Sequence, residues 1–287
     1  MSTFSVKIAI VPSKPNPLSE GELKQIENLT SLFKHNDMLP PNLIPNMTSV
    51  DIGVVNIPAD KIKAGDSYDR VALMGLIDEN QDGKTFVIFV KSTTVSVLDS
   101  NGLIKMIYDL CDGYMKSTPE EKTHFDLMYL AKWADRCDLF KPVANVFNPT
   151  ATLVETSSPQ GLQAVLISPE GLAKLKLKLS QPIDYPVSVL LSHLVNKGKL
   201  KALTTTPNVM EFGSQYATNS SDYMKSKECS EPPSDNGKPT PKGSNLSLFV
   251  FIIIFLVVVA VFYFLVTMVF VPKQLSQTVV VPLRVTG

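Results

Sequence analysis

The sequence has 287 residues, with 27 Lys and Arg against 27 Asp and Glu and 44% hydrophobic residues, and this composition excludes disorder as the default for the part before Thr204. Its three cysteines are an odd number without a CxxC spacing, so a disulfide framework is not expected and a reducing compartment is favoured. The charge is uneven, because residues 170–201 carry six lysines against two acids.

The first elements expected are a strand, a helix and a second strand. The alternating FSVKIAIVP at residues 4–12 is typical of a strand. Ser19 with Glu22 forms a capping-box pattern, and the apolar residues that follow recur at helical spacing until about His35. After a proline-rich linker, Val50–Ile57 is expected to form the next strand.

A β-hairpin is the prediction for the segment around DENQDGK. The apolar runs Arg70–Ile77 and Thr85–Val90 flank it and would pair, with Asp82-Gly83 in the turn. A third run, Thr93–Leu98, would extend the hairpin to a meander.

Two helices are expected next. The first would begin at Asp99 or Ser100 and end at Gly113, because glycine favours the left-handed conformation that closes many helices. The second is predicted from Thr118 to about Arg136, since Thr118, Pro119 and Glu121 form a capping box with proline at the first helical position.

The pattern then returns to strands. Three are expected, at Thr150–Glu155, Leu162–Ser168 and Leu172–Leu179, the last with leucines on one face and lysines on the other. A helix at Val187–Asn196 follows and is closed by Gly198.

The strongest signal is Leu248–Val271, which has 24 residues without a charge, a glycine or a proline. As a helix it would be about 36 Å long, enough to span a bilayer with some tilt. The expected fold class is α+β, with a soluble N-terminal domain of mixed strands and about four helices. The organisation is an α+β cytoplasmic domain at 1–203, a flexible stalk at 204–247, a transmembrane helix at 248–271 and a short tail at 272–287.

The N-terminal domain is expected on the cytoplasmic side of the membrane. The N-terminus has no basic leader followed by an apolar core, and Lys238 and Lys242 precede the apolar segment against Lys273 and Arg284 after it. Four glycosylation sequons, at Asn28, Asn46, Asn219 and Asn245, favour the opposite side.

The lysine-rich block is the candidate binding site for anionic lipid or an acidic partner. On a strand, alternate lysines would project from one face at roughly 7 Å spacing, close to the spacing of phosphates on a charged surface. An edge strand protected from aggregation by lysines is the favoured explanation of the pattern, ahead of lipid or acidic-partner contact, and nucleic acid is least favoured because no aromatic residues interleave the lysines. The six residues are Lys174, Lys176, Lys178, Lys197, Lys199 and Lys201.

No motif indicates catalysis, a metal or a cofactor. Asp78, Asn80, Asp82 and Gly83 match the first half of a calcium loop, but Phe89 stands where the bidentate glutamate should be. GxSxG and phosphate-binding glycine loops are absent, and the three histidines (His35, His124 and His193) fall in predicted helices or at their ends.

These observations favour a non-enzymatic, single-pass, tail-anchored-like membrane protein that acts as an interaction or scaffold module. The expected partners are the membrane and a protein of unknown identity, with self-association as a further option. Two alternatives belong to other classes. One is a viral structural protein of matrix type, which would bind anionic lipid through the lysines, and the other is an enzyme with an unrecognised site in a deep polar pocket.

Overall fold

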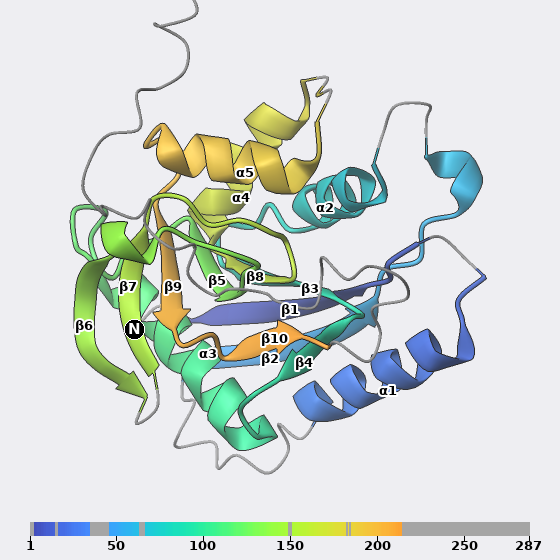
Figure 1. Cartoon of the computed structure of the whole chain (residues 1–287), viewed down its shortest axis with the longest axis horizontal. Coiled ribbons are helices and arrows are strands. Elements are labelled where there is room, and N and C mark those ends of the chain that lie inside the picture. The colour runs from blue at the N-terminus through green and yellow to red at the C-terminus, as the bar shows by residue number, and fades with distance from the viewer. Residues whose placement is uncertain are drawn as a thin grey trace, which may run out of the picture. The chain divides into compact units, whose positions relative to one another are not determined.

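The computed structural model of the chain describes residues 3–14, 17–34, 46–62, 67–148, 151–181, 183 and 185–213 (Figure 1). They form an α+β domain with one mixed sheet and five α-helices. The expected stalk, the apolar segment and the tail lie outside the described residues. Within the described ranges, no helix has the length and apolar character needed to cross a bilayer.

The main sheet has eight strands in the order β2-β1-β3-β8-β5-β9-β7-β6, and a second sheet pairs β4 with β10. Strands β1, β2, β3, β5 and β9 run in one direction, because β8 is antiparallel to both β3 and β5. Their carboxyl ends therefore share one edge of the sheet. The strands are β1 Phe4–Val11, β2 Met47–Val54, β3 Thr85–Lys91, β4 Thr94–Ser96, β5 Leu127–Ala131, β6 Lys141–Asn148, β7 Ala151–Thr156, β8 Ala164–Ile167, β9 Ala202–Thr206 and β10 Met210–Phe212.

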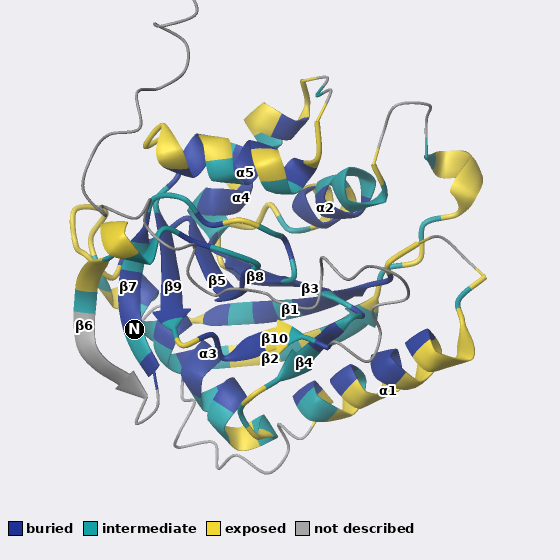
Figure 2. Ribbon diagram, viewed as in Figure 1, coloured by how far each residue is buried: buried dark blue, intermediate teal, exposed yellow. Residues whose placement is uncertain are grey.

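Helices cover both faces of this sheet (Figures 1 and 2). Phe86 and Ile88 of β3 belong to the core that α1 and α3 complete, whereas Val87 and Phe89 belong to the core under α2, α4 and α5. Burial on both faces explains why β3 reads as a continuous apolar run. The α-helices are α1 Glu20–Lys34, α2 Tyr68–Glu79, α3 Ser100–Lys116, α4 Pro169–Leu179 and α5 Val187–Asn196, and the short 3-10 turns are η3 Ala59–Lys61 and η4 Cys137–Leu139.

Several expected elements are confirmed. They are the strands β1, β2, β7 and β8 and the helices α1 and α5. The Ser19 hydroxyl accepts a hydrogen bond from the Glu22 backbone at 3.3 Å, as a capping residue should. Helix α3 is also present, and Asp99 caps it, but it continues through Gly113 to Lys116 because Tyr114 is buried in the core beyond the glycine.

The predicted hairpin around DENQDGK is wrong. Residues Arg70–Ile77 lie in α2, whose first turn is capped by the Ser67 hydroxyl, and their buried positions repeat at helical spacing. Strand β3 pairs in parallel with β1 instead, and β4 pairs with β10 rather than extending a meander.

The predicted helix from Thr118 to Arg136 is also wrong. The capping-box residues form turns, and Leu127–Ala131 is the central strand β5, buried at every position. A strand that is buried on both faces shows no alternation of apolar and polar residues. The prediction was therefore determined by the capping-box residues upstream, which are typical of the start of a helix.

The folded unit continues beyond residue 203. Strand β9 lies inside the main sheet between β5 and β7, and β10 completes the small sheet, so the described domain reaches Gly213. The sequence of β9 is polar although Thr204 and Thr205 are buried, which explains why it resembled the start of a stalk.

Candidate functional site

The first three predicted lysines lie on helix α4 and not on a strand. Ser168 caps this helix by accepting from the Gly171 backbone at 3.0 Å, and Pro169 occupies its first turn. Residues two apart on a helix point about 200° apart, so Lys174, Lys176 and Lys178 do not form the predicted single face.

Lys174 is held by two acids. Its Nζ lies 2.8 Å from Asp126 and 2.9 Å from Glu170, and the Asp126 side chain is only 2% exposed. Burial opposes the charge on Lys174, but these two hydrogen bonds hold its pKa above the usual value. A backbone N–H, that of Lys201, also donates to Asp126 at 2.8 Å. This lysine is therefore part of the structure of the domain.

The other lysines have different surroundings. Lys176 pairs with Asp78 of α2 at 3.1 Å, and Lys178 is exposed. Lys197 and Lys199 are exposed on the turn that follows α5, and the Nζ of Lys201 donates to the Glu121 carbonyl. The structure thus divides the predicted block into an α4 part and a part that follows α5.

A groove of about 580 Å³ lies between α5 and the segments that flank β5 and β8. Trp133 follows the carboxyl end of β5, and Gln160 and Gly161 precede β8, so both segments lie at the edge where the parallel strands end. Carboxyl edges of open sheets are the usual ligand-binding positions in folds of this kind. The α5 residues that line the groove are Ser188, Val189, Ser192, His193 and Asn196.

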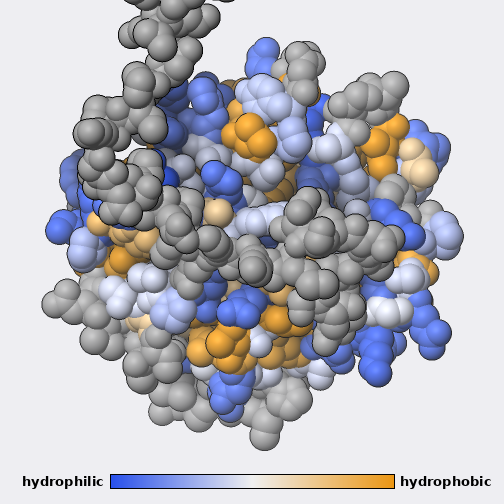
Figure 3. All heavy atoms as spheres, viewed as in Figure 1, coloured by the Kyte–Doolittle hydropathy of each residue, from blue (hydrophilic) through white to orange (hydrophobic). Residues whose placement is uncertain are grey.

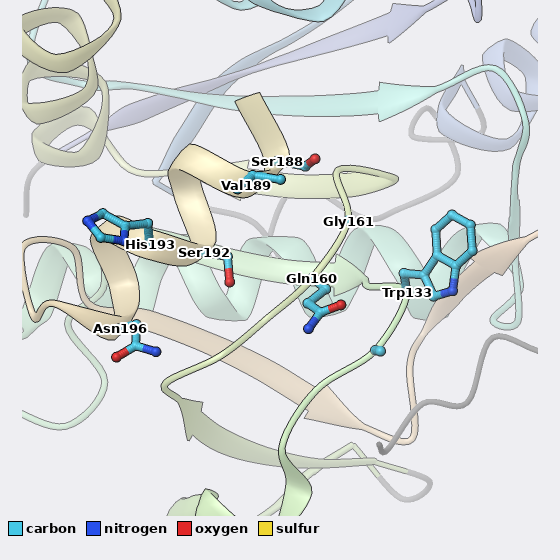
Figure 4. A pocket seen from close by; sticks show the side chains of 9 residues that line it. Trp133, Gln160, Gly161, Ser188, Val189, Ser192, His193 and Asn196 are labelled. Carbon is cyan, nitrogen blue, oxygen red and sulfur yellow. The ribbon is translucent and has the colours of Figure 1, made fainter. Parts of the chain in front are cut away.

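The groove is lined by hydroxyls, amides, one imidazole and one indole, without an acidic or permanently basic side chain. In Figure 4 the Ser192 hydroxyl points from α5 toward Gln160, and Asn196 lies one turn further along the helix. His193 points to another side of α5 than Ser192 does, as consecutive helical residues must. Such a surface offers hydrogen bonds to an uncharged polar group.

The close approach of the two segments that line the groove requires a glycine at position 161. The Trp133 backbone N–H donates to the Gln160 carbonyl at 2.7 Å, which brings the two segments into close contact. Gly161 has φ +96°, and a Cβ there would lie 2.3 Å from Gln163 Oε1. A residue with a side chain would strain the backbone and separate the two segments.

A buried lysine, directly after the end of β5, holds the groove segment in place. Lys132 is 3% exposed, and its Nζ donates to Thr204 Oγ1 at 3.0 Å, to Asn208 Oδ1 at 3.0 Å and to the Thr205 carbonyl at 3.2 Å. The buried Asp135 accepts from the Thr156 hydroxyl at 2.7 Å, and burial raises its pKa despite the attraction of Lys132. This network joins the groove segment to β9 and β7.

The carboxyl ends of β1 and β3 are closed off by internal hydrogen bonds. Glu22 Oε1 accepts from the Ser13 backbone at 2.6 Å and from the Ser92 hydroxyl at 2.7 Å. Burial opposes ionisation of Glu22, yet these hydrogen bonds hold its pKa below the usual value. The groove beside α5 is therefore the better candidate site at this edge.

The other residues that the sequence analysis considered as candidates make contacts that stabilise the fold. Asp82 closes its own turn by accepting from the Lys84 and Thr85 backbones, and the Lys84 contact in particular lowers its pKa. His124 stacks on Tyr114 with ring centroids 4.2 Å apart and lies 3.0 Å from Glu170. Among the described residues, no cluster of acids, histidines and cysteines could hold a metal ion.

Two cysteines fall within the described residues. Cys111 is a buried free thiol, and burial raises its pKa well above the usual value. Cys137, in the turn η4 that follows the groove segment, is disulfide-bonded, which differs from the expectation that the cysteines are unpaired.

Comparisons with known proteins leave the identity open. No family model matches the sequence, and no curated protein matches it. Thirty chains of solved structures match, among them "Crystal Structure of A197 from STIV", which is 11% identical with a TM-score of 0.35 over 70% of this chain and 81% of that chain. A similarity this remote identifies neither a ligand nor a reaction.

Proposed function

We propose that the protein is a non-enzymatic interaction module, tethered to a membrane by Leu248–Val271, that binds its partner in the groove beside α5. The observation that carries the proposal is the groove itself, with its uncharged hydrogen-bonding side chains at the carboxyl edge of the sheet. Thirty-four residues separate the last described residue, Gly213, from the start of the apolar segment. Even fully extended, those residues would hold the domain within about 120 Å of the bilayer.

The groove favours binding over hydrolysis. A serine nucleophile needs a base within hydrogen-bond reach, whereas Ser192 and His193 project in different directions from α5 (Figure 4). The matrix-type alternative is less favoured, because Lys174 and Lys176 of α4 are engaged by Asp126 and Asp78. The visible face of the domain mixes small apolar patches with hydrophilic ones (Figure 3).

Filling the groove should abolish partner binding. We expect Ser192→Trp to reduce recovery of crosslinked partner from membranes at least tenfold, because the indole would occupy the space beside Gln160 and Asn196. The matched control is Glu27→Trp, an exposed position on α1, which should bind as the wild type does. Equal recovery from both variants would remove the groove from the proposal. Turnover of a small molecule that Ser192→Trp alone abolishes would favour the enzyme instead.

We propose the cytoplasmic side of the membrane for the domain, because of the lysines that flank the apolar segment. The disulfide at Cys137 is the opposing observation, since disulfides persist mainly in oxidising compartments. The sequons differ in access: Asn28 is exposed on α1, whereas Asn46 is 8% exposed and donates to Asp112.

Glycosidase treatment of the full chain from cells tests this orientation. We expect no change in mobility, and digestion of the domain by protease added to intact membrane vesicles that expose their cytoplasmic face. A mobility shift that Asn28→Gln removes and Asn46→Gln leaves in place would put the domain on the lumenal side.

A further inference from the structure

A second cavity, of about 340 Å³, adjoins the groove at Asn196, which lines both. It lies between β7 and the turn that connects α5 to β9. Lys141 and Lys201 line it together with the hydroxyls of Thr156 and Ser157. This cleft is therefore basic where the groove is uncharged.

The positive charge of the cleft is only partly engaged by contacts within the domain. Lys201 Nζ donates to the Glu121 carbonyl, which is a neutral acceptor and leaves the charge uncompensated. The Lys141 side chain is 76% exposed, and its contact with Glu155 is a long one, 3.3 Å. An exposed ion pair of this kind contributes little and is readily exchanged. Glu155 is the one acid in the lining. Lys197 and Lys199 flank the lining residue Gly198, whose φ of +64° allows the tight turn, so the formal local charge is +3.

We propose that the cleft and the groove form one site for a phosphate-bearing polar headgroup, with the phosphate between Lys141 and Lys201 and the uncharged, hydroxyl-rich part along the groove. Lysine ammonium groups bind phosphate as point charges, and the Ser157 hydroxyl adds a neutral donor, whereas the Thr156 hydroxyl already donates to Asp135. Asn196 joins the two parts, because it lines both cavities. The assignment rests on the proposed binding role of the groove.

This site accounts for part of the lysine block. The proposed ligand would be bound by Lys197, Lys199 and Lys201 together with Lys141. Lys141 is 56 residues earlier in the chain than Lys197 and was not part of the predicted lysine block. A headgroup of this chemistry can come from a phosphorylated lipid in the membrane or from a free phosphorylated polyol. The same contacts would hold either.

The test uses the full chain in detergent micelles and separates the two sources. Calorimetry measures binding of inositol trisphosphate, inorganic phosphate and unphosphorylated inositol. Flotation measures binding to phosphatidylcholine vesicles with and without phosphatidylinositol phosphate. We expect the trisphosphate to bind more tightly than inorganic phosphate and inositol not to bind. Lys141→Gln/Lys201→Gln should bind the trisphosphate about 30-fold more weakly, which corresponds to about 2 kcal/mol.

The matched control is Lys176→Gln/Lys178→Gln, which removes the same charge from α4 and should change the affinity less than twofold. Equal losses in the two double variants would show general charge attraction and overturn the site, as would absence of binding to the trisphosphate and to the vesicles. Partner crosslinking that persists when the headgroup does not bind would refute this inference and leave the proposed function standing.

Discussion

Replacing Lys132 by Met should lower the free energy of unfolding by about 3 kcal/mol or more. The ammonium is almost fully buried and donates to three groups on β9 and the turn after it. The substitution therefore removes the Lys132 donor from the buried Asn208 Oδ1, and the Thr205 carbonyl keeps only the longer hydrogen bond from the Thr204 hydroxyl, at 3.3 Å, among its side-chain contacts. It also removes the nearby positive charge from the buried Asp135, which should then take up a proton more readily.

Urea unfolding of the full chain in detergent, followed by tryptophan fluorescence, measures this loss. Trp133 is the only tryptophan and follows Lys132 directly, so the signal reports on the groove segment. Lys178→Met is the control, because this exposed lysine should change the free energy of unfolding by less than about 0.5 kcal/mol. Similar unfolding midpoints for the two variants would contradict the structural role of Lys132.

Replacing Asp126 by Ala should cost about 3–5 kcal/mol, since it removes the buried acceptor of both the Lys174 side chain and the Lys201 backbone. Lys174→Met should cost less, because Asp126 keeps the Lys201 donor and Lys174 is itself 41% exposed. The double variant should be at least about 1 kcal/mol more stable than the sum of the two losses predicts.

The same urea experiment on the two single variants and the double variant gives this coupling free energy. Losses that add would show that the pair at Asp126 does not interact, and the account of Lys174 as a structural residue would fail. Lys174 would then again be a candidate for binding anionic lipid.

The amphipathic elements were the predictable part of the fold. Helices α1 and α5 expose one side, and strand β1 alternates buried with half-buried residues over its first half, so their apolar residues repeat at the period of the element. Strand β5 exposes neither side and has no such repeat. Leu172–Leu179 satisfied two periods: Leu172, Leu175 and Leu179 are buried at helical spacing, and only Leu177, which is 72% exposed, completes the alternation typical of a strand.

The candidate site could not be predicted in the same way. Trp133, Gln160 and Ser192 are far apart in the sequence and belong to no motif, and they meet only because β8 inserts antiparallel between β3 and β5. A local signal existed in Gly161, but a glycine two residues after a proline also marks an ordinary turn. The six lysines could be recognised in the sequence as a basic block. Which of them lie close together could not, because that depends on α4 being a helix and not a strand.

The most direct test of the central claim, that the groove is where the protein meets its partner, is position-specific photo-crosslinking in intact cells. A photoreactive residue replaces Ser192 in one full-length variant and Glu27, on the opposite face of the sheet, in another. We predict one dominant crosslinked species from position 192 that is absent from position 27. The same species at equal yield from both positions, or none from position 192, would contradict the account.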